Sequence, residues 1–375
     1  MTATMISLSC AKKAEDAVAE VGGGSSSSRY LYLTTGACYS GSGITTFNNT
    51  TSTNKVYRIN LSTGAQQEAK IADYTDAKSQ TGDTPVGIAS ADANNIYILV
   101  QNATAGLKRI DKIPKENDPL RTQMTNNAAI FTANSKALAK TGNGDLLVSK
   151  TSAIERVSGA DFSRIPVGAN PYVNAPAAPC ATSTTLITAM GTLSNQMIYF
   201  AHAAASQNRI GFVKAAGYSA AGDCTVAQAA PNANAFPTAV AYDQANEILL
   251  VAYGNSSAVT ADVNSIYAYK LTVTSNSVAI ASSHKIYDLT MYPATYGFQL
   301  YGISAMALDS STNKLYVSTA ITTATTVVNY RVERLTYTPS LVGVTNTAVL
   351  TKPSASYFLS HGADTKCIAD MMVDN

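Results

Sequence analysis

The chain has 375 residues, of which 46% are hydrophobic and only 13% are charged, and its formal net charge is +2. A hydrophobic content of this size supports a large buried core and excludes a wholly disordered chain. The lysines and arginines are scattered instead of forming a basic stripe, which excludes nucleic acid as a partner. Nor does any segment reach the roughly 18 to 20 apolar residues that a membrane-spanning helix needs.

Residues 1–28 are expected to lie outside the folded domain. The apolar start "MTATMISLSC" leads into polar residues and then into the tract "GGGSSSS", whose composition is typical of a flexible linker. A short apolar stretch that ends in Cys10 and precedes a polar tether resembles the start of bacterial lipoproteins, although Ser7 stands where that family usually has leucine. The resemblance implies that Cys10 is lipidated. A disordered leader with an incidental cysteine is the alternative interpretation.

One strand pattern recurs six times after the tether, at spacings of about 50 to 67 residues. Each copy is rich in β-branched or aromatic residues and follows a turn that contains Asn, Asp or Gly. The copies are "RYLYLTT" (29–35), "NIYILVQ" (95–101), "GDLLVSK" (144–150), "QMIYFAH" (196–202), "EILLVAY" (247–253) and "KLYVSTA" (314–320). Five copies follow another short strand, and a third strand of alternating character follows each, as in "KVYRINL" and "NYRVERLT".

Four short strands per repeat predict an all-β fold, a six-bladed β-propeller that occupies residues 29–375 as a single domain. A seven-bladed ring, with a degenerate blade within residues 166–182, is the alternative. On this repeat pattern the chain resembles extracytoplasmic β-propeller lipoproteins of bacteria, of the broad group that includes NHL-repeat and YncE-like propellers. The resemblance implies a mostly non-catalytic binding or scaffold role in the cell envelope, in the periplasm or at the cell surface.

The end of the chain predicts how the ring closes. The sequence "CIADMMVD" (367–374) aligns with "GISAMALD" (302–309), which has the pattern of an innermost strand. The C-terminal strand should therefore pair with residues 29–35 and complete the first blade, so that the ring has no free edge.

The same alignment predicts a disulfide between Cys38 and Cys367, which lie across from one another at the ends of the two paired strands. Cys180 and Cys224 both fall in the fourth blade, and whether they form a second disulfide stays open. Paired cysteines together with a lipidated Cys10 favour an oxidising, extracytoplasmic compartment. Reduced thiols in a cytosolic protein are the alternative.

The sequence contains no motif of a known catalytic, phosphate-binding or metal-binding class, so no catalytic residue, metal site or cofactor is predicted. His202 and His284 fall on strands, whereas His361 falls on a connection between blades and is a candidate binding residue. Four aspartates at strand ends precede turns and are predicted to cap them instead of binding a metal: Asp92, Asp243, Asp309 and Asp374.

The long connections should gather on the face of the propeller that is opposite to the tether, where a rigid scaffold usually carries its binding residues. They are 36–54, 75–84, 166–182, 254–264, 291–301 and 320–328. In one of them Tyr292, Tyr296, Phe298 and Tyr301 offer amphipathic area suited to a protein or glycan partner. Aromatic packing between blades explains these four residues equally well.

A hydrolase that uses the central tunnel, similar to lactonases, is the alternative function. The enzymes of that family resemble rings of acidic and amide side chains around one metal ion. The predicted inner strands of this chain contribute Asp370 and little else that is acidic, and a divalent cation prefers several carboxylates. A non-catalytic binding protein is therefore the favoured interpretation.

Overall fold

The computed structural model describes most of the chain after the tether. The described residues are 29–35, 37–39, 47–49, 54–61, 68–76, 79–102, 107–116, 122–123, 135–150, 153–166, 186–203, 208–214, 224–231, 235–254, 264–288, 291, 302–323, 326–345, 347–352, 358–360 and 368–374. Within these ranges the elements are β-strands, together with one 3-10 turn, η3 (Pro339–Leu341). None of the described elements is a helix of the length and apolar character needed to span a membrane.

The strands form six sheets and one separate hairpin. The first sheet has the order β26 (Ile368–Asp374), β1 (Tyr30–Thr35), β4 (Lys55–Asn60), β5 (Glu68–Asp73). The second has β6 (Asp83–Ser90), β7 (Asn95–Asn102), β8 (Leu107–Pro114), β9 (Thr122–Gln123), and the third has β10 (Leu138–Lys140), β11 (Leu146–Lys150), β12 (Ala153–Val157).

The remaining sheets follow the same order of strands along the chain. The fourth has β13 (Leu186–Thr192), β14 (Ile198–Ala203), β15 (Arg209–Val213), β16 (Cys224–Ala229). The fifth has β17 (Phe236–Asp243), β18 (Ile248–Gly254), β19 (Ser265–Val273), β20 (Val278–Tyr287). The sixth has β21 (Ala305–Asp309), β22 (Lys314–Thr323), β23 (Thr326–Tyr337), β24 (Leu350–Thr351), and β25 (Leu359–Ser360) also pairs with β23. The separate hairpin consists of β2 (Ala37–Tyr39) and β3 (Phe47–Asn49).

Burial explains why the second strand of each sheet is so apolar in sequence. β18, with the sequence "ILLVAYG", is buried at every position because neighbouring sheets cover both of its faces. The outer strand β20, with the sequence "VAIASSHKIY", alternates between partly buried and exposed positions over its first half. A continuous apolar run therefore marks a strand between two sheets, and an alternating run marks an outer strand.

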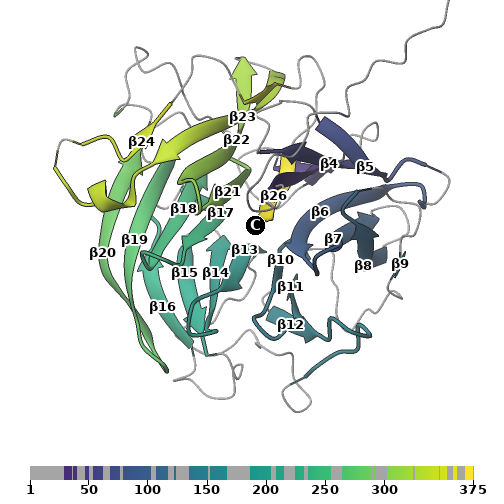
Figure 1. Cartoon of the computed structure of the whole chain (residues 1–375), viewed down its shortest axis with the longest axis horizontal. Helices are drawn as coiled ribbons and strands as arrows, with labels where there is room; N and C mark the ends of the chain where they lie inside the picture. Colours follow the sequence, from purple (N-terminus) through teal and green to yellow (C-terminus); the bar gives the residue numbers. More distant parts are fainter. Residues whose placement is uncertain are drawn as a thin grey trace, which may run out of the picture.

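The sheets stand around a common centre, with their innermost strands turned towards it (Figure 1). The inner strands β6, β10, β13, β17, β21 and β26 contact one another in this order, and β26 also contacts β6. The core is divided into layers between adjacent sheets. In one layer, for example, Tyr32 and Val56 of the first sheet pack with Ile88 and Ile96 of the second.

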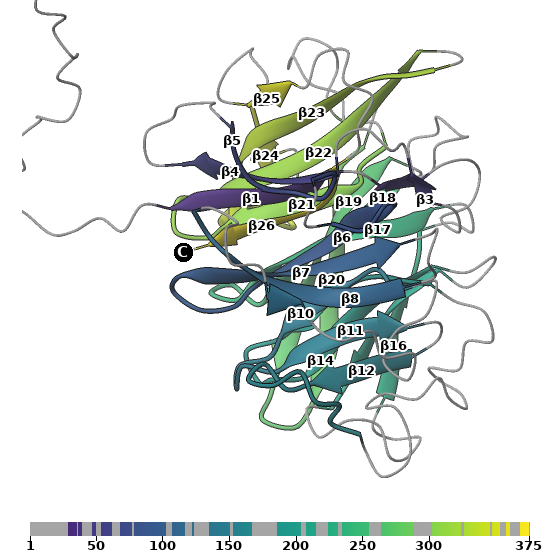
Figure 2. The same ribbon diagram turned by 90° about the vertical axis from the view of Figure 1, so that its right-hand side faces the viewer.

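The predicted pairing of the C-terminal strand with residues 29–35 is confirmed. β26 lies antiparallel to β1, with Tyr30 opposite Asp374 and Thr35 opposite Ile368, and β4 lies on the other side of β1. Figure 2 shows the start of β1 and the C-terminal end on the same side of the molecule. We call the end of the sheets at Tyr30 and Asp374 the proximal end, and the end at Thr35 and Ile368 the distal end.

Strand direction assigns each connection to one of these two ends. β1 runs from the proximal to the distal end, so the connection 36–54 begins and ends distally, as the pairing of Thr35 with Lys55 shows. The connection 254–264 is flanked in the same way by Tyr253 and Ser265. Most residues of the long connections lie outside the described part of the chain.

Tight turns at the proximal end contain three of the four predicted aspartate caps. Asp92 accepts hydrogen bonds from the Asn94 backbone N–H (2.9 Å) and the Asn95 side chain (2.8 Å). Asp243 likewise binds Asn246, and Asp309 binds the backbone of Ser311 and Thr312. These three predictions are therefore confirmed.

The fourth aspartate, Asp374, has a different role from the turn cap that its sequence pattern predicts. It forms an ion pair with Lys115 of the second sheet and accepts a hydrogen bond from the Ser90 hydroxyl at 3.4 Å. Because both partners lie in the next sheet, Asp374 attaches β26 to its neighbour.

Candidate functional site

A cavity of about 250 Å³ lies at the centre of the fold, bordered by residues of all six inner strands. The strand edges face this space, and the side chains along it are mostly small, such as Ala89, Thr188, Ala239 and Ser304. Backbone polar groups at an unpaired strand edge need hydrogen-bond partners when they are buried. The cavity is therefore where polar side chains are required.

Side chains from neighbouring sheets supply these partners. The Ser304 hydroxyl donates to the Ile368 carbonyl (2.7 Å), and the Thr188 hydroxyl donates to the Pro237 carbonyl (2.6 Å). Each of these bonds joins the inner strand of one sheet to that of the next. The cavity is thus held open by cross-sheet hydrogen bonds from short side chains.

Lys136 is one of three charged residues that border this cavity, together with Lys140 and Asp370. It directly precedes β10, its backbone N–H donates to the Ser149 hydroxyl (2.8 Å), and it is only 3% exposed. Burial lowers the pKa of its ammonium group well below the usual range, and the nearby carboxyl of Asp370 opposes this shift only in part. Desolvation disfavours a buried ammonium, so Lys136 loses its proton far more readily than a surface lysine.

Asp370, on β26, is the acidic residue of this site. Its carboxyl accepts hydrogen bonds from the backbone N–H groups of Ile88 (3.0 Å) and Met371 (2.9 Å). Desolvation by burial raises its pKa to about 7 despite both bonds and the charge of Lys136. A carboxyl that titrates near neutral pH can donate or accept a proton under ordinary conditions.

Tyr199, on β14, adds a phenol to the same cavity. It is buried, and burial raises its pKa above the usual range, so the hydroxyl keeps its proton. Its ring lies over Gly191, where a Cβ atom would stand only 2.3 Å from the Tyr199 hydroxyl oxygen. Glycine at position 191 therefore makes room for this ring.

The cavity thus combines an amine, a carboxyl and a phenol in a space that admits a molecule of a few heavy atoms. Such groups bind a small polar molecule and can move a proton on it. In the described part of the chain no three His, Cys, Asp or Glu side chains come close enough together to hold a metal ion.

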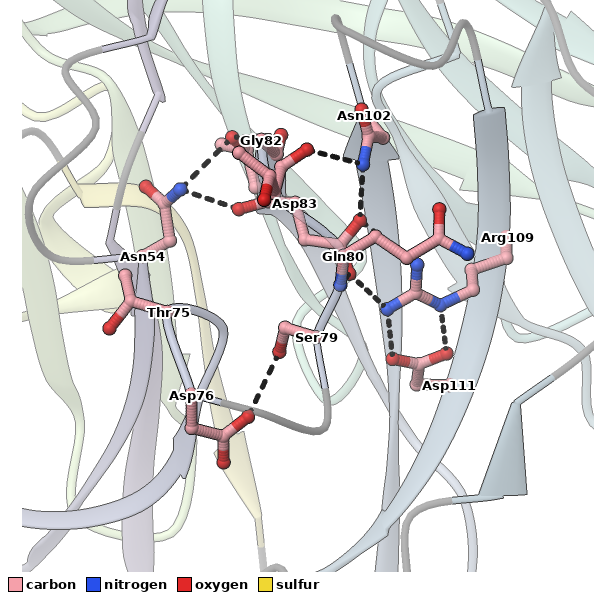
Figure 3. Close-up of polar contacts among 12 residues, drawn as sticks. Asn54, Thr75, Asp76, Ser79, Gln80, Gly82, Asp83, Asn102, Arg109 and Asp111 are labelled. Carbon is pink, nitrogen blue, oxygen red and sulfur yellow. Dashed lines mark hydrogen bonds and ion pairs between the residues drawn. The ribbon is translucent and has the colours of Figure 1, made fainter.

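A second group of buried charges lies at the distal end, between the first and second sheets. Arg109 on β8 donates to Asp83 (2.7 and 3.0 Å) and to Asp111 (2.8 and 3.2 Å), and both carboxylates are fully buried (Figure 3). Burial alone would lower the pKa of Arg109, but the hydrogen bonds and charges of its two partners raise it above the usual value. We call these three residues the Arg109 cluster.

The Arg109 cluster also fixes the connection between the two sheets. The Asp83 carboxylate accepts hydrogen bonds from the Gln80 backbone N–H (3.0 Å) and from the Asn102 side chain (2.9 Å). The Asn54 side chain, which precedes β4, donates to the Asp83 carbonyl (Figure 3). Residues 79–83 are therefore held by both sheets at the distal end.

Acidic residues recur at one position of the third strand in three sheets. They are Asp111, Glu155 and Glu333, opposite the buried residues Ile98, Val148 and Val317 of the second strand. Each has a basic partner: Arg164 lies 2.9 Å from Glu155, and Lys352 lies 3.0 Å from Glu333. Their sequence signal is an acid among basic residues inside an apolar strand, as in "LKRIDKI", "AIERV" and "YRVERL".

The predicted binding residues lie outside the described residues: Tyr292, Tyr296, Phe298, Tyr301 and His361. Met291, at the start of the same segment, is described and is 42% exposed. It borders a surface groove between β20 and residues 341–349, which also contains the exposed Val344. His284 lies in this groove, on the outer strand that the sequence predicts, and its ring nitrogen is 2.9 Å from the Ser282 hydroxyl.

The cysteine predictions also fall largely outside the described residues. Cys10, Cys180 and Cys367 lie there, whereas the strands that contain Cys38 and Cys224 are described as β2 and β16. The lipidation and the two disulfides remain predictions.

Sequence reasoning singled out Asp370 as an acid on an inner strand but missed Lys136. The available signal was a lysine in "NSKALAK", directly before an inner strand, where the equivalent residues of the other repeats are small or apolar. The importance of Lys136 depends on its neighbours in three dimensions, which the repeat pattern does not contain.

No protein-family model and no curated protein matches this chain in sequence. Among solved structures, a protein from Lactobacillus plantarum is similar, with a TM-score of 0.52 and 12% identity over 93% of this chain and 100% of that one. A quinoprotein alcohol dehydrogenase-like protein from Bacteroides thetaiotaomicron has a TM-score of 0.43 and 12% identity over 93% of this chain and 79% of that one. The GH74 xyloglucanase from Xanthomonas campestris has a TM-score of 0.48 and 14% identity over 81% of this chain and 44% of that one. The fold is all-β and of the propeller type, as the repeats predict.

Proposed function

We propose that this protein is a non-catalytic binding or scaffold protein of the cell envelope, held near its N-terminus and presenting its distal end to a protein partner or a glycan. The observation that carries the proposal is the pairing of β26 with β1. It brings Tyr30 and Asp374 together at the proximal end. The strand ends that flank the long connections lie at the opposite end, so a tether before Arg29 leaves those connections pointing away from the membrane.

In this proposal the six sheets are the blades of a closed six-bladed propeller. The cyclic order of contacts among the inner strands, including that between β26 and β6, supports it. A ring closed by its last strand has no free sheet edge and forms a rigid support for surface loops. The hydrogen bonds of the Arg109 cluster add to this rigidity where residues 79–83 join two sheets at the distal end.

The predicted disulfide between Cys38 and Cys367 fits the same arrangement. Cys367 directly precedes β26, Cys38 lies in β2, and β2 contacts β26. A covalent bond here would join the two ends of the chain beside the pairing of β1 with β26, and would favour an oxidising compartment.

The first experiment is an intact-mass measurement and a non-reducing peptide map of the full chain isolated from its native membrane fraction. We expect a lipid mass on Cys10 and a cross-linked peptide that joins Cys38 to Cys367. An unmodified Cys10 together with free thiols at Cys38 and Cys367 would overturn the envelope assignment.

The orientation of the two ends is tested by labelling the membrane-anchored chain with a polyethylene glycol maleimide. Thr81→Cys places a thiol at the distal end and Asn94→Cys places one at the proximal end, both at exposed positions. We expect the Thr81→Cys protein to be labelled several-fold faster, and the two rates to become equal after detergent release. The parent chain corrects for native thiols, and equal rates on the anchored chain would contradict the proposed orientation.

A hydrolase that acts in the central cavity is a second candidate, favoured by one observation. The carboxyl of Asp370 has a pKa raised to about 7 by burial and borders the cavity, as a general base for water would. Hydrolysis of small lactones and aryl esters by the full chain, with and without calcium, tests this candidate. Activity that Asp370→Asn abolishes would support it, and no turnover above the buffer rate would exclude it for these substrates.

A further inference from the structure

Lys136 and Asp370 meet in the cavity although one comes from the third sheet and the other from the C-terminal strand. Their strands, β10 and β26, both contact β6. Asp370 is hydrogen-bonded to the backbone N–H of Ile88 on β6, and the Lys136 carbonyl would be 3.0 Å from a Cβ atom on the adjacent Gly87. The Lys136 backbone and the Asp370 carboxyl therefore approach β6 from its two sides, and the amine and the carboxyl are close enough for their charges to interact.

The Arg109 cluster shows what this chain does with charges that only stabilise the fold. There, hydrogen-bonded carboxylates surround the cation and hold its proton more tightly than water would. In the cavity the opposite holds, because desolvation outweighs the attraction of Asp370 and lowers the pKa of Lys136. A buried amine with a lowered pKa, beside a proton donor and an open space, can act as a nucleophile.

We propose that Lys136 binds small aldehydes reversibly, as an imine, in the central cavity, and that Asp370 is the proton donor for this reaction. This is a covalent binding site in addition to the partner surface proposed at the distal end, and it does not depend on that surface. The cavity of about 250 Å³ and its short side chains, such as Ala89 and Ala239, restrict the ligand to a few heavy atoms.

The neutral amine of Lys136 attacks the carbonyl carbon, a C–N bond forms, and a proton passes from nitrogen to oxygen to give a carbinolamine. The carboxylic acid of Asp370 then gives its proton to the carbinolamine hydroxyl, which leaves as water while the nitrogen lone pair forms the C=N bond. The product is a protonated imine paired with the Asp370 carboxylate. Water reverses each step and releases the aldehyde, so no oxidant or reductant is needed.

Tyr199 contributes to the same environment without titrating. Its hydroxyl stays protonated because burial raises its pKa, and its ring closes one side of the cavity over Gly191. A site closed in this way keeps bulk water from competing with the aldehyde.

The test uses acetaldehyde with cyanoborohydride, which converts each imine into a stable N-ethyl-lysine, on the full native chain at pH 7. Peptide mapping then gives the rate at each lysine. We expect Lys136 to be modified at least ten-fold faster than Lys70, whose side chain is 51% exposed, and faster than Lys140, which borders the same cavity but donates to the Ala91 carbonyl. A rate at Lys136 equal to or below that at Lys70 would overturn the proposal.

The pH dependence is a second readout, which mere accessibility would not produce. The ratio of the Lys136 rate to the Lys70 rate should rise as the pH falls, because the lowered pKa of Lys136 keeps a larger fraction of its amine neutral at lower pH. A ratio that stays constant would mean that Lys136 titrates as a surface lysine does.

Asp370→Asn separates proton donation from simple electrostatics. If Asp370 acted only as a nearby charge, its loss would lower the pKa of Lys136 further and raise the labelling rate. Loss of the proton donor instead predicts a rate at Lys136 at least five-fold lower, with the rate at Lys70 unchanged. Lys314→Met is the control, because Lys314 lies outside the cavity and donates to the Thr336 hydroxyl, and it should leave the Lys136 rate as it is. An Asp370→Asn protein that reacts as fast as the parent would refute the assigned role.

Discussion

The Arg109 cluster and the pair formed by Lys136 and Asp370 are both held away from bulk water, yet they differ in what surrounds each charge. Arg109 makes four hydrogen bonds to two carboxylates. Lys136 and Asp370 border a cavity, and burial moves both of their pKa values in the direction that favours the neutral form. In the Arg109 cluster the hydrogen-bonded partners outweigh desolvation, whereas at the cavity desolvation outweighs the charge partner.

The largest expected effect is that of removing the cation from the Arg109 cluster. Arg109→Met leaves two carboxylates in a fully buried position without their partner, which should lower the free energy of unfolding by about 3–5 kcal/mol. Urea denaturation followed by circular dichroism measures this loss.

Arg156 provides a matched control for this variant, because it also lies on a third strand and pairs with an acid, Asp145, at a position nearer the surface. Arg156→Met should cost about 1 kcal/mol or less. If the two variants lost the same stability, enclosure of the charge would not be what distinguishes the Arg109 cluster.

The next effect concerns how stability changes with pH. The pKa of Asp370 is raised from 3.8 to about 7 in the folded protein, so its carboxyl binds a proton more tightly when the chain is folded. The resulting stability is fully present below pH 4 and is lost as the pH rises through 7. Relative to Asp370→Asn, the parent should therefore lose about 2–4 kcal/mol of unfolding free energy between pH 4 and pH 8.

Asp92 supplies the control of opposite sign. Burial acts on it in the same direction as on Asp370, but hydrogen bonds from Lys112 and Asn94 lower its pKa to about 2. Stability that depends on Asp92 is thus lost only as the pH falls through 2, and the difference between Asp92→Asn and the parent should stay constant from pH 4 to pH 8. A constant difference for Asp370→Asn as well would show that Lys136 keeps the carboxylate charged.

A smaller effect, of opposite sign, is expected at Lys108 on β8. This side chain is buried, and burial lowers its pKa to about 8; no acidic partner for it lies within the described ranges. The folded protein binds this proton less tightly than the unfolded chain does, so the resulting penalty is present at pH 7 and fades as the pH rises from 8 to 10.5. Lys108→Met should accordingly raise the unfolding free energy at pH 7 by about 1–3 kcal/mol.

Lys112 lies on the same strand and is the natural comparison, since it pairs with Asp92 at 2.9 Å at a more exposed position. Lys112→Met should slightly destabilise the protein, by less than about 1 kcal/mol. A loss of stability in the Lys108→Met protein would mean that the methylene chain of Lys108 matters more for packing than its charge costs.

The strands were predictable because their pattern is local. "ILLVAYG" is apolar throughout and becomes β18 between two sheets. At the proximal turns, the aspartate accepts a hydrogen bond from a backbone N–H two or three residues further along the chain. The pairing of β26 with β1 was predictable for a related reason, since "CIADMMVD" repeats the pattern of an inner strand that lacks its neighbour.

The two charged sites were less predictable, because each joins residues from strands that are not neighbours in the sequence. The repeated acid of the third strand suggests that Asp111 meets a base, but nothing in "LKRID" indicates that Asp83 completes the Arg109 cluster. For Lys136, the depressed pKa arises from burial among six strands, which only the assembled fold creates. The four aromatic residues of the segment 291–301, and Cys10, Cys180 and Cys367, lie outside the described residues, so the interpretations that depend on them stay predictions.

The place of β26 also has a consequence for how the protein is made. β1 is among the first parts of the domain to be synthesised, and its partner β26 is among the last. The edge of β1 that pairs with β26 therefore stays unpaired until β26 has been made. A sheet that depends on such distant segments folds slowly and leaves an apolar strand unpaired in the growing chain. The first sheet, and with it the ring proposed here, therefore forms only after β26 has been synthesised.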